Sequence, residues 1–518
     1  MNKTKAIYGD EAFDTLKEGV DQVFNAVAPT MGAKGRNAVY AQYGMTKVTN
    51  DGVTIARQIK PEDPFHDEGA QMINQAAEQT NYVAGDGTSG TIVLGKHIVD
   101  YGIDVMEVDK INPQILRKQI MVGLEKLKKE LKNQSKPIKT KEELIEVAKI
   151  SVEDEELAKM VAGLVYDLGV DSAIVAEETY GSTVRTEIHK GYSWDEGYVS
   201  PMMINTQKGE AIMEDCAVFV TDRYMNLATD LVNALDETVK NWGKQKILVV
   251  ADNVEGELLQ SIIVTKQQTG INIVAVKRPK TVQELEDIAT ITGATAVTQE
   301  KGIDKITAGT KEKKGHIGFA ERVVVTRDKA MIVCNKYQAN VDMLIKEIEA
   351  QIEAEDDEKY GIIEDLKNRL AKLKGGVARI KVGANTEAER NYKQKKLEDA
   401  IGACKSALQE GVVAGAGVTL FEMDKILDES IPGERILQKS IRQPHIQIMK
   451  NAGYTAPIDE PMKINVLTDE IVDNLIDVGI VDPAKVIRCE LENAVSFAVT
   501  LLTTHCAIAN IPDEVEKK

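Results

Sequence analysis

The strongest chemical signal in the sequence is the run Gly85-Asp86-Gly87-Thr88-Ser89-Gly90-Thr91. A long helical stretch precedes it and a second helix begins within it. Glycines let a backbone approach a phosphate closely, and hydroxyls and amides at the start of a helix bind anions. Asp86 is suited to offer Mg²⁺ an oxygen beside substrate phosphates. The run lacks the lysine of a Walker A motif, so on spacing alone a phosphate loop and an ordinary turn before a capped helix remain equally open.

A second glycine cluster lies at Gly411-Val412-Val413-Ala414-Gly415-Ala416-Gly417, directly after a helix that contains Glu398 and Asp399. One interpretation is a helix-breaking hinge whose small residues allow close packing. The other is a loop that lies against a nucleotide, with an acid nearby to polarise water. The sequence alone does not show whether this loop meets the first one.

The pattern of apolar residues predicts helices at both ends of the chain and an α/β domain in the middle. The first helical segment is marked by three- and four-residue steps through Phe13, Leu16, Val20, Val23, Phe24 and Val27. Between about 191 and 376, strand-like runs alternate with helices, as in α/β domains, at Ala217–Val220, Ile247–Val250 and Ile273–Val276. A charged helical hairpin is expected at about Val341–Leu373. A chain of 518 residues should form about three domains at roughly 150 residues each.

Composition excludes several classes of function. The net charge of −18 argues against nucleic-acid binding, which depends on cationic side chains. No run approaches the roughly 18 apolar residues that span a bilayer, and the first residues lack the apolar run of a secretory signal. We therefore expect a cytoplasmic protein. The five cysteines are scattered without CxxC spacing, which favours buried, inert thiols over a metal site or disulfides.

Six ordered motifs resemble the nucleotide site of the GroEL-type chaperonins. They are Thr30-Met31-Gly32-Ala33-Lys34-Gly35-Arg36-Asn37, Asn50-Asp51-Gly52-Val53, Gly85-Asp86-Gly87-Thr88, Leu397-Glu398-Asp399-Ala400, Gly411 to Gly417, and Gly479-Ile480-Val481-Asp482-Pro483. The resemblance runs from about residue 5 to residue 510. Two stretches are similar to the bacterial branch of the family: Gly479 to Arg488 and Val254 to Glu257. Two others are more similar to the archaeal and eukaryotic branch: Asn50-Asp51-Gly52 and Thr88-Ser89. This mixture indicates a divergent member.

The resemblance implies a multidomain fold of the α and α/β kind. It implies a helical equatorial ATP-binding domain at 1–134 and 411–518 and a small intermediate hinge domain at 135–190 and 377–410. The α/β apical domain, which binds clients, is expected at 191–376. Pro137 and Gly411 should form the lower hinge, and Gly191 and Gly376 the upper one.

The resemblance also assigns roles at the nucleotide site. Asp86 should hold Mg²⁺, Thr30 and Asn50 should offer oxygens to K⁺, and Asp51 and Asp399 should orient or activate the attacking water. Asp399 is expected to approach only when the hinge domain closes. The residues implied to contact ATP are Thr30, Met31, Gly32, Asp86, Gly87, Thr88, Ser89, Gly90, Ile150, Gly415, Ile480 and Asp482.

A client-binding surface is implied on two helices of the middle domain, expected at Asp230–Trp242 and Glu255–Gln268. Core packing is the default for most apolar residues there. The family pattern nevertheless points to a cavity-facing apolar band that would bind unfolded chains, made of Tyr198, Met202, Met203, Val232, Leu235, Leu259, Ile263 and Val264.

Four departures from the family pattern bear on assembly. Ala416 replaces a glycine of the second loop. Glu196 stands where an arginine usually pairs with a neighbouring subunit's glutamate, here Glu387, so subunit contacts and cooperativity are expected to differ. The stretch 451–464 is short and Ile446 replaces an arginine there, which leaves single and double rings both open.

The resemblance implies an ATPase subunit of a homo-oligomeric, heptameric ring that encloses non-native proteins, with or without a co-chaperonin lid. We expect it to bind neither nucleic acid nor membrane. A ring-forming holdase or scaffold with little ATPase activity is the alternative, and a phosphotransferase acting on a small acceptor is a weaker one. Retention of Asp51, Asp86 and Asp399 together favours the ATPase.

Overall fold

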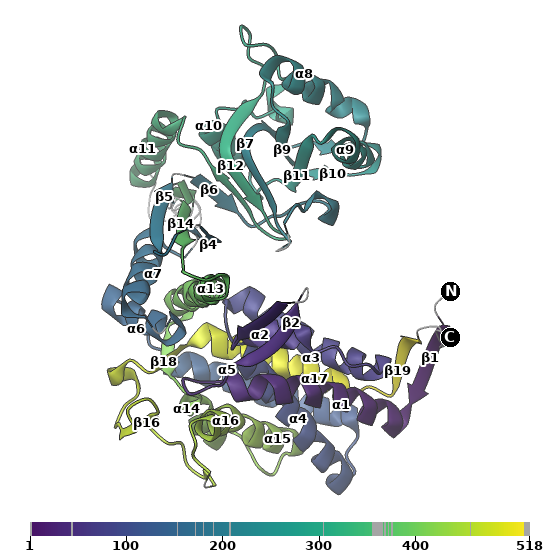
Figure 1. Ribbon diagram of the computed structural model, residues 1–518, viewed down its shortest axis with the longest axis vertical. Coiled ribbons are helices and arrows are strands. Elements are labelled where there is room, and N and C mark those ends of the chain that lie inside the picture. Colours follow the sequence, from purple (N-terminus) through teal and green to yellow (C-terminus); the bar gives the residue numbers. More distant parts are fainter. Residues whose placement is uncertain are drawn as a thin grey trace. The chain divides into compact units, whose positions relative to one another are not determined.

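The computed structural model describes residues 3–42, 45–152, 154–170, 172–179, 181–189, 191–206, 209–303, 305–354, 366, 369–370, 372–373, 377–455 and 457–511. Contacts divide the chain into two compact units (Figure 1). The first contains residues 1–166, 178–183 and 382–518, and the second contains residues 167–177 and 184–381. The residues expected to form a separate hinge domain are shared between these units. The division into three domains therefore stays a prediction, and Gly376 lies outside the described residues.

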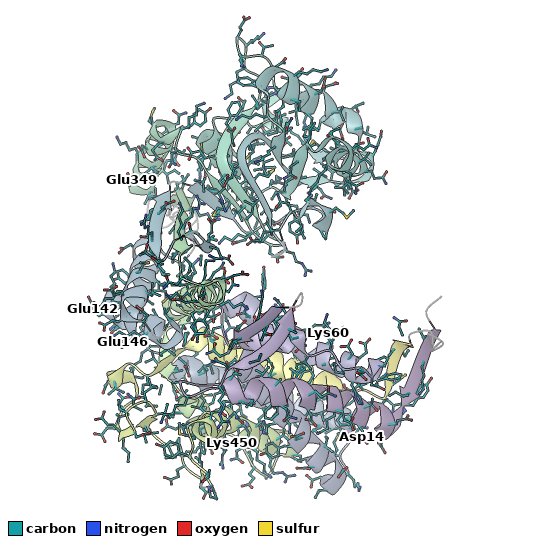
Figure 2. All side chains as sticks on the ribbon, viewed as in Figure 1. Asp14, Lys60, Glu142, Glu146, Glu349 and Lys450 are labelled. Atoms are coloured by element: carbon teal, nitrogen blue, oxygen red, sulfur yellow. The ribbon has the colours of Figure 1, made fainter. Side chains whose placement is uncertain are left out.

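The first unit is mainly helical. Its longer helices are α1 (Gly9–Val27), α3 (Pro64–Ala84), α4 (Thr88–Asp109), α5 (Pro113–Gln134), α6 (Lys141–Val152), α7 (Glu155–Leu168), α13 (Glu387–Glu410) and α17 (Ala484–Leu502). Shorter helices are α2 (Gly52–Gln58), α14 (Val418–Glu422), α15 (Pro432–Ser440) and α16 (Gln443–Asn451). Charged side chains such as Asp14, Lys60 and Lys450 are exposed on this unit (Figure 2).

The apolar periodicity of α1 is confirmed, because it buries Leu16, Val20, Val23 and Val27. α1 crosses α3 at very short range. A Cβ atom added to Gly69 of α3 would lie 1.9 Å from the carbonyl oxygen of Leu16, so only glycine fits this crossing.

The central helix of the first unit is α17, which is buried along most of its length and packs against α3, α4, α5 and α13. Short strand pairs border this helical core: β1 (Lys3–Tyr8) with β19 (Cys506–Ile511), β2 (Ala38–Gln42) with β3 (Met45–Thr49), β15 (Val412–Ala414) with β18 (Val481–Pro483), and β16 (Ile464–Asn465) with β17 (Glu470–Ile471). The pair β1–β19 joins the two ends of the described chain, with Lys3 opposite Ile511.

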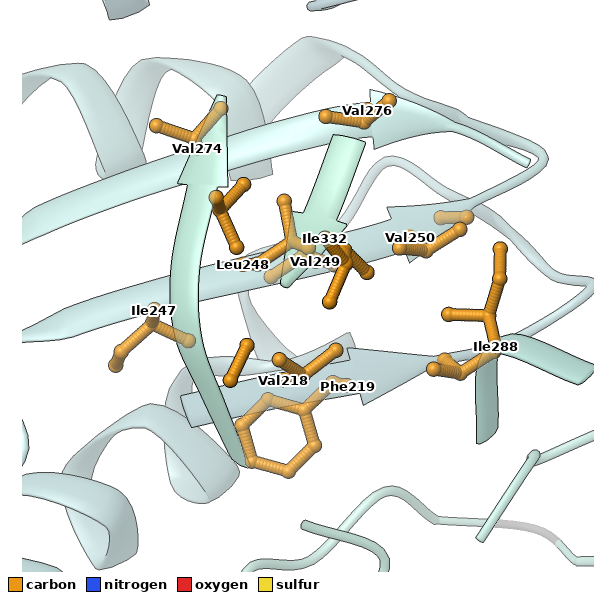
Figure 3. Packing of buried hydrophobic residues seen from close by; sticks show 14 of the residues in the cluster. Val218, Phe219, Ile247, Leu248, Val249, Val250, Val274, Val276, Ile288 and Ile332 are labelled. Atoms are coloured by element: carbon orange, nitrogen blue, oxygen red, sulfur yellow. The ribbon is translucent and has the colours of Figure 1, made fainter. Parts of the chain in front are cut away.

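The second unit is an α/β structure around a six-stranded sheet of order β11-β9-β7-β12-β13-β6. The strands are β6 (Gly191–Trp194), β7 (Ala211–Val220), β9 (Lys246–Ala251), β11 (Asn272–Lys277), β12 (Gly318–Val325) and β13 (Ala330–Val333). β7, β9 and β11 run parallel, and the remaining pairs are antiparallel. The predicted strand runs in β7, β9 and β11 are confirmed, and they form the buried core in Figure 3 with Ile288 and Ile332.

The helices of the second unit are α8 (Val232–Trp242), α9 (Gly256–Thr269), α10 (Val282–Thr292) and α11 (Gln338–Ala354). β8 (Tyr224–Met225) pairs with β10 (Asn253–Val254), and a smaller sheet contains β4 (Ala173–Glu178), β14 (Val377–Val382) and β5 (Arg185–His189). α11 accounts for the first arm of the predicted charged hairpin, and most of the second arm lies outside the described residues.

Two general predictions are refined by the structure. Four cysteines are buried as expected, but Cys506 is exposed on β19, so the prediction that all five are buried is wrong. Burial raises the pKa of Cys216 and of Cys404 to about 12, which makes these thiols inert. Among the described residues, no helix combines the length and the apolar character needed to cross a membrane.

Candidate nucleotide site

The phosphate loop predicted at Gly85–Thr91 connects α3 to α4 through two glycines in the left-handed region, Gly85 (φ +76°) and Gly87 (φ +96°). Gly87 is the residue before α4, and no side chain caps the helix there. The first amides of a helix have no partner within it, and the helix dipole adds positive potential. The loop therefore presents an uncapped N-terminus of a 22-residue helix, which is suited to an anion such as a phosphate.

Asp51 is brought to this loop by α2. Its carboxylate caps α2 by accepting hydrogen bonds from the amides of Val53 at 3.3 Å and Thr54 at 3.0 Å. The next residue, Gly52, packs so closely on the loop that an added Cβ would lie 2.6 Å from the Ser89 hydroxyl oxygen. The predicted turn at Asn50-Asp51-Gly52 is thus the start of a helix whose cap lies beside the phosphate loop.

Asp399 reaches the same place on α13. A Cβ added to Gly402 would lie 2.5 Å from Gly85 Cα, so α13 and the loop touch backbone to backbone. Burial, followed by the charges of Asp86 and Asp51, raises the pKa of Asp399 well above its usual value. Burial also raises the pKa of Asp86, with the charge of Asp51 adding to the effect. In this conformation Asp399 is therefore already an electrostatic neighbour of both other acids.

Asp51 behaves in the opposite way. Burial would raise its pKa, but the ammonium of Lys395 and hydrogen bonds from Thr54 outweigh burial and hold the pKa of Asp51 below its usual value. Lys395 lies on α13, and its Nζ is 2.8 Å from Asp51 Oδ2. Nothing in the sequence patterns singled out this lysine.

The second glycine loop lies beside β18, whose Asp482 is close enough to Asp86 to interact electrostatically. β15 pairs with β18, with Val413 opposite Asp482, and the Gly415 amide donates to the Ile480 carbonyl at 3.0 Å. Burial and the charge of Asp86 raise the pKa of Asp482 to about 7. The interpretation of the second loop as part of a nucleotide site is therefore supported by its position.

Ala416 occupies a strained position in this loop, with a φ of +56°. The left-handed region is unfavourable for residues with a Cβ. The Ala416 carbonyl lies 2.8 Å from His445 Nδ1, while His445 Nε2 accepts from the Met462 amide at 3.0 Å. His445 is buried, and burial lowers its pKa, so a neutral ring bridges the loop to the short stretch that follows α16.

For the remaining residues predicted to contact the nucleotide, the structure gives local contacts rather than contacts with the phosphate loop. Thr30 is buried and its hydroxyl donates to the Val27 carbonyl, and Gly32 has a φ of +85° and faces Ile448. The carbonyl of Met31 accepts from Asn451 at 2.8 Å. Ile150 is 46 % exposed on α6. Its proposed role at the edge of the pocket stays a prediction, as do the roles of Thr30 and Asn50 toward K⁺.

Glu490 of α17 was missed by the sequence analysis. It is 6 % exposed and packs behind the phosphate loop, where a Cβ added to Gly90 would lie 2.1 Å from Glu490 Oε1. Burial, followed by the charges of Asp482 and Asp86, raises the pKa of Glu490 well above its usual value. One acidic residue in a long helix gives no signal by itself, which explains why only the structure reveals it.

The candidate client surface lies in the second unit. Met202, Val232 and Val264 are exposed, and Tyr198, Leu235, Leu259 and Ile263 are half-buried. Met203 is 1 % exposed, and its sulfur accepts from the Ala275 amide. The prediction that Met203 faces a cavity is therefore wrong for this conformation, because its side chain fills the core. Tyr224 and Leu227 are about half exposed in the segment before α8 and were not predicted.

The turn that carries Met202 is attached to α9. The Nζ of Lys266 donates to the carbonyl oxygens of Met202, Met203 and Ile204 at 3.2, 3.0 and 3.4 Å. This contact places an exposed methionine beside the helix that carries Val264.

The fold consists of an α/β unit inserted into the sequence of a helical unit. The site combines two glycine loops with three carboxylates at a helix N-terminus. Together these features define a chaperonin-like nucleotide-binding protein. The model of the TCP-1/cpn60 chaperonin family matches residues 23–512. The chain belongs to this family.

Solved structures of the chaperonin gp146 from bacteriophage EL, crystallised in the presence of ATP-BeFx, share this fold. Crystal form II matches with a TM-score of 0.70 and crystal form I with a TM-score of 0.64. In both cases the identity is 21 %, and the match covers 98 % of this chain and 99 % of the phage chain. The predicted multidomain α and α/β chaperonin fold is confirmed.

Proposed function

We propose that this chain is the subunit of a ring-forming chaperonin that hydrolyses ATP to drive the binding and enclosure of non-native proteins. The observation that carries the proposal is the convergence of Asp51, Asp86 and Asp399 on the uncapped N-terminus of α4. These acids come from three separate parts of the sequence, and a merely structural turn would not need them together.

The donor set fits Mg²⁺ only together with a nucleotide. Among the described residues, no group of three or more histidine, cysteine or acidic side chains is arranged to hold a metal alone. Mg²⁺ usually takes one or two carboxylates and completes its shell with phosphate oxygens and water. The anionic cluster around Asp86 provides such a carboxylate, and the bound ion would neutralise charge on the phosphates.

The remaining groups complete the proposed site. The amides of Thr88, Ser89 and Gly90 at the start of α4 hold the phosphates, and Asp482 on β18 faces the ribose hydroxyls. Asp51 and Asp399 hold the water. Its oxygen attacks the terminal phosphorus, the bond to the bridging oxygen breaks, ADP leaves with the electron pair, and the water proton passes to the Asp399 carboxylate and then to solvent. The products are ADP and inorganic phosphate.

The client function rests on the exposed apolar residues of the second unit. Met202, Val232 and Val264, together with the half-buried members of the set, give an apolar surface with an adaptable methionine. Such a surface binds unfolded chains without sequence specificity. We further propose that the chain folds into three domains, that seven subunits form the ring, and that K⁺ binds at Thr30 and Asn50.

The decisive experiment is ATP turnover by the purified full-length chain and by Asp399→Asn, with Mg²⁺ present and K⁺ varied. We expect turnover that Asp399→Asn reduces by about 10² or more while ADP still binds. Asp215→Asn, which alters an exposed aspartate of the second unit, is the control and should turn over normally. If the wild-type chain binds ATP without turnover, the holdase alternative replaces the enzyme. Negative-stain images with and without ATP would give the ring and its state.

A further inference from the structure

One ion pair ties α13 to α2 across the nucleotide site. The Nζ of Lys395 lies 2.8 Å from Asp51 Oδ2 and also contacts the hydroxyl of Thr54. Lys395 is 39 % exposed along its side chain and Asp51 is 17 % exposed, so the contact is made at the edge of the site. Both partners belong to the first unit.

Lys395 and Asp399 lie on the same face of α13. They are four residues apart in one helix, and side chains at this spacing are neighbours. The helix therefore presents a cation and a carboxylate together toward the phosphate loop. Because both residues lie on one helix, the position of α13 determines both the approach of Asp399 to Asp86 and that of Lys395 to Asp51.

The need for a cation here follows from the charges. Asp51 and Asp399 lie close enough to Asp86 for their like charges to interact unfavourably, in a site where burial already disfavours charge. The phosphate loop itself contains no lysine. The ammonium of Lys395 donates a hydrogen bond to the Asp51 carboxylate, and the charge of Lys396 acts on Asp86 and Asp399.

The hydrogen bonds of Asp51 also determine which of its oxygens faces a water. Oδ2 accepts from the Thr54 amide, the Thr54 hydroxyl and Lys395. Among the described residues, Oδ1 accepts only from the Val53 amide, at 3.3 Å. A carboxylate oxygen has two lone-pair sites. Lys395 and Thr54 thus occupy Oδ2 and leave Oδ1 with an acceptor site for a water.

We propose that Lys395 is a positioning residue for ATP hydrolysis: it fixes the Asp51 carboxylate so that Oδ1 accepts a hydrogen bond from the attacking water while α13 holds Asp399 beside the same water. This inference rests on the proposed function. Lys395 acts through Asp51 and does not touch the nucleotide. Its loss should therefore slow turnover without weakening nucleotide binding.

The test compares Lys395→Met, Lys395→Arg and Lys393→Met in the full-length, assembled protein. Lys393 lies on the same helix and pairs with Glu389 at 2.7 Å, so Lys393→Met controls for the loss of a lysine from α13. The measurements are kcat and KM for ATP, the affinity for ADP by calorimetry, and the unfolding temperature without nucleotide.

We expect Lys395→Met to lower kcat by about tenfold or more, because a small misplacement of a water-orienting group is costly. KM and ADP affinity should change less than about twofold, because Lys395 makes no contact that contributes to nucleotide binding in the ground state. Lys395→Arg should restore most of kcat, because guanidinium also donates to carboxylate. Lys393→Met should behave as wild type.

Several results would overturn the inference: an unchanged or higher kcat in Lys395→Met, an equal loss in Lys393→Met, or a Lys395→Arg variant no better than Lys395→Met. A loss of ADP affinity that parallels the loss of kcat would also overturn it, because Lys395 would then be a binding residue. A wild-type chain without turnover is a different result, since it refutes the proposed function itself.

Discussion

Gly85 of the phosphate loop and Gly402 of α13 meet with no side chain between them: a Cβ added to Gly85 would lie 2.4 Å from Gly402 Cα. This contact sets how closely α13, and with it Asp399, can approach Asp86. Any side chain at either position would separate the loop from the helix.

Gly402→Ala should therefore lower ATPase kcat by about tenfold or more, because the new methyl must push α13 away from the loop. Overpacking should also lower the free energy of unfolding by about 1–3 kcal/mol. The matched control is Gly163→Ala in α7, where only the flexible end of Lys141 lies near the added Cβ. That change should leave kcat unaltered and stabilise the helix by about 0.5–1 kcal/mol. Normal turnover in Gly402→Ala would show that the contact does not set the position of Asp399.

Ala416 offers a gain in stability. Its φ of +56° is unfavourable for any residue with a Cβ, so the cost lies in the backbone conformation rather than in room for one methyl. Ala416→Gly should raise the free energy of unfolding by about 1 kcal/mol, measured from denaturant midpoints at unchanged slope. Ala414→Gly, in the neighbouring strand β15, should destabilise the protein instead. If both changes destabilise the protein equally, the strain at Ala416 is not real.

Much of the fold follows from local patterns in the sequence. The apolar steps of α1 and the β-rich runs of β7 and β9 predict their elements because burial imposes a period on each of them. The six ordered motifs also predict the family. Contacts between residues far apart in the sequence leave no such local pattern. The pairing of β1 with β19, for example, depends on the packing of the whole first unit.

At the candidate site, the residues that belong to motifs could be predicted from the sequence, and the others could not. Asp51, Asp86 and Asp399 carry motif signals, and the structure brings them together. Lys395 carries none, because it stands in the basic run Lys393-Gln394-Lys395-Lys396 and only helix geometry selects the one that reaches Asp51. Met203 was misplaced for a related reason, since its neighbour Met202 is chemically identical and the turn decides which of the two is buried.

The client surface can be tested separately from hydrolysis. Met202→Glu and Val264→Glu should each weaken capture of a chemically unfolded client by about tenfold, because each places a charge in an apolar contact worth about 1.5 kcal/mol. The measurement is suppression of client aggregation, with ATP turnover followed in parallel. Turnover should stay at the wild-type rate, since the nucleotide site lies in the other unit. Val122→Glu changes a residue 56 % exposed on α5 and should alter neither property. Undiminished capture by both variants would remove α9 and the Met202 turn from the client surface.

Glu490 should make the stability of the nucleotide-free protein depend on pH. Burial and the charges of Asp482 and Asp86 raise the pKa of Glu490 in the folded state. When the pH exceeds 4.5, the usual pKa of this carboxyl, the unfolded chain releases a proton that the folded chain still holds. Stability is then lost as pH rises from that value toward the folded pKa. Glu490→Gln keeps the shape without the proton, so its unfolding temperature should exceed that of the wild type by an amount that grows with pH. Glu429→Gln, at an exposed position, should follow the wild-type curve at every pH. A gap between Glu490→Gln and wild type that stays constant from pH 5 to pH 8 would mean that Glu490 does not titrate differently in the folded chain.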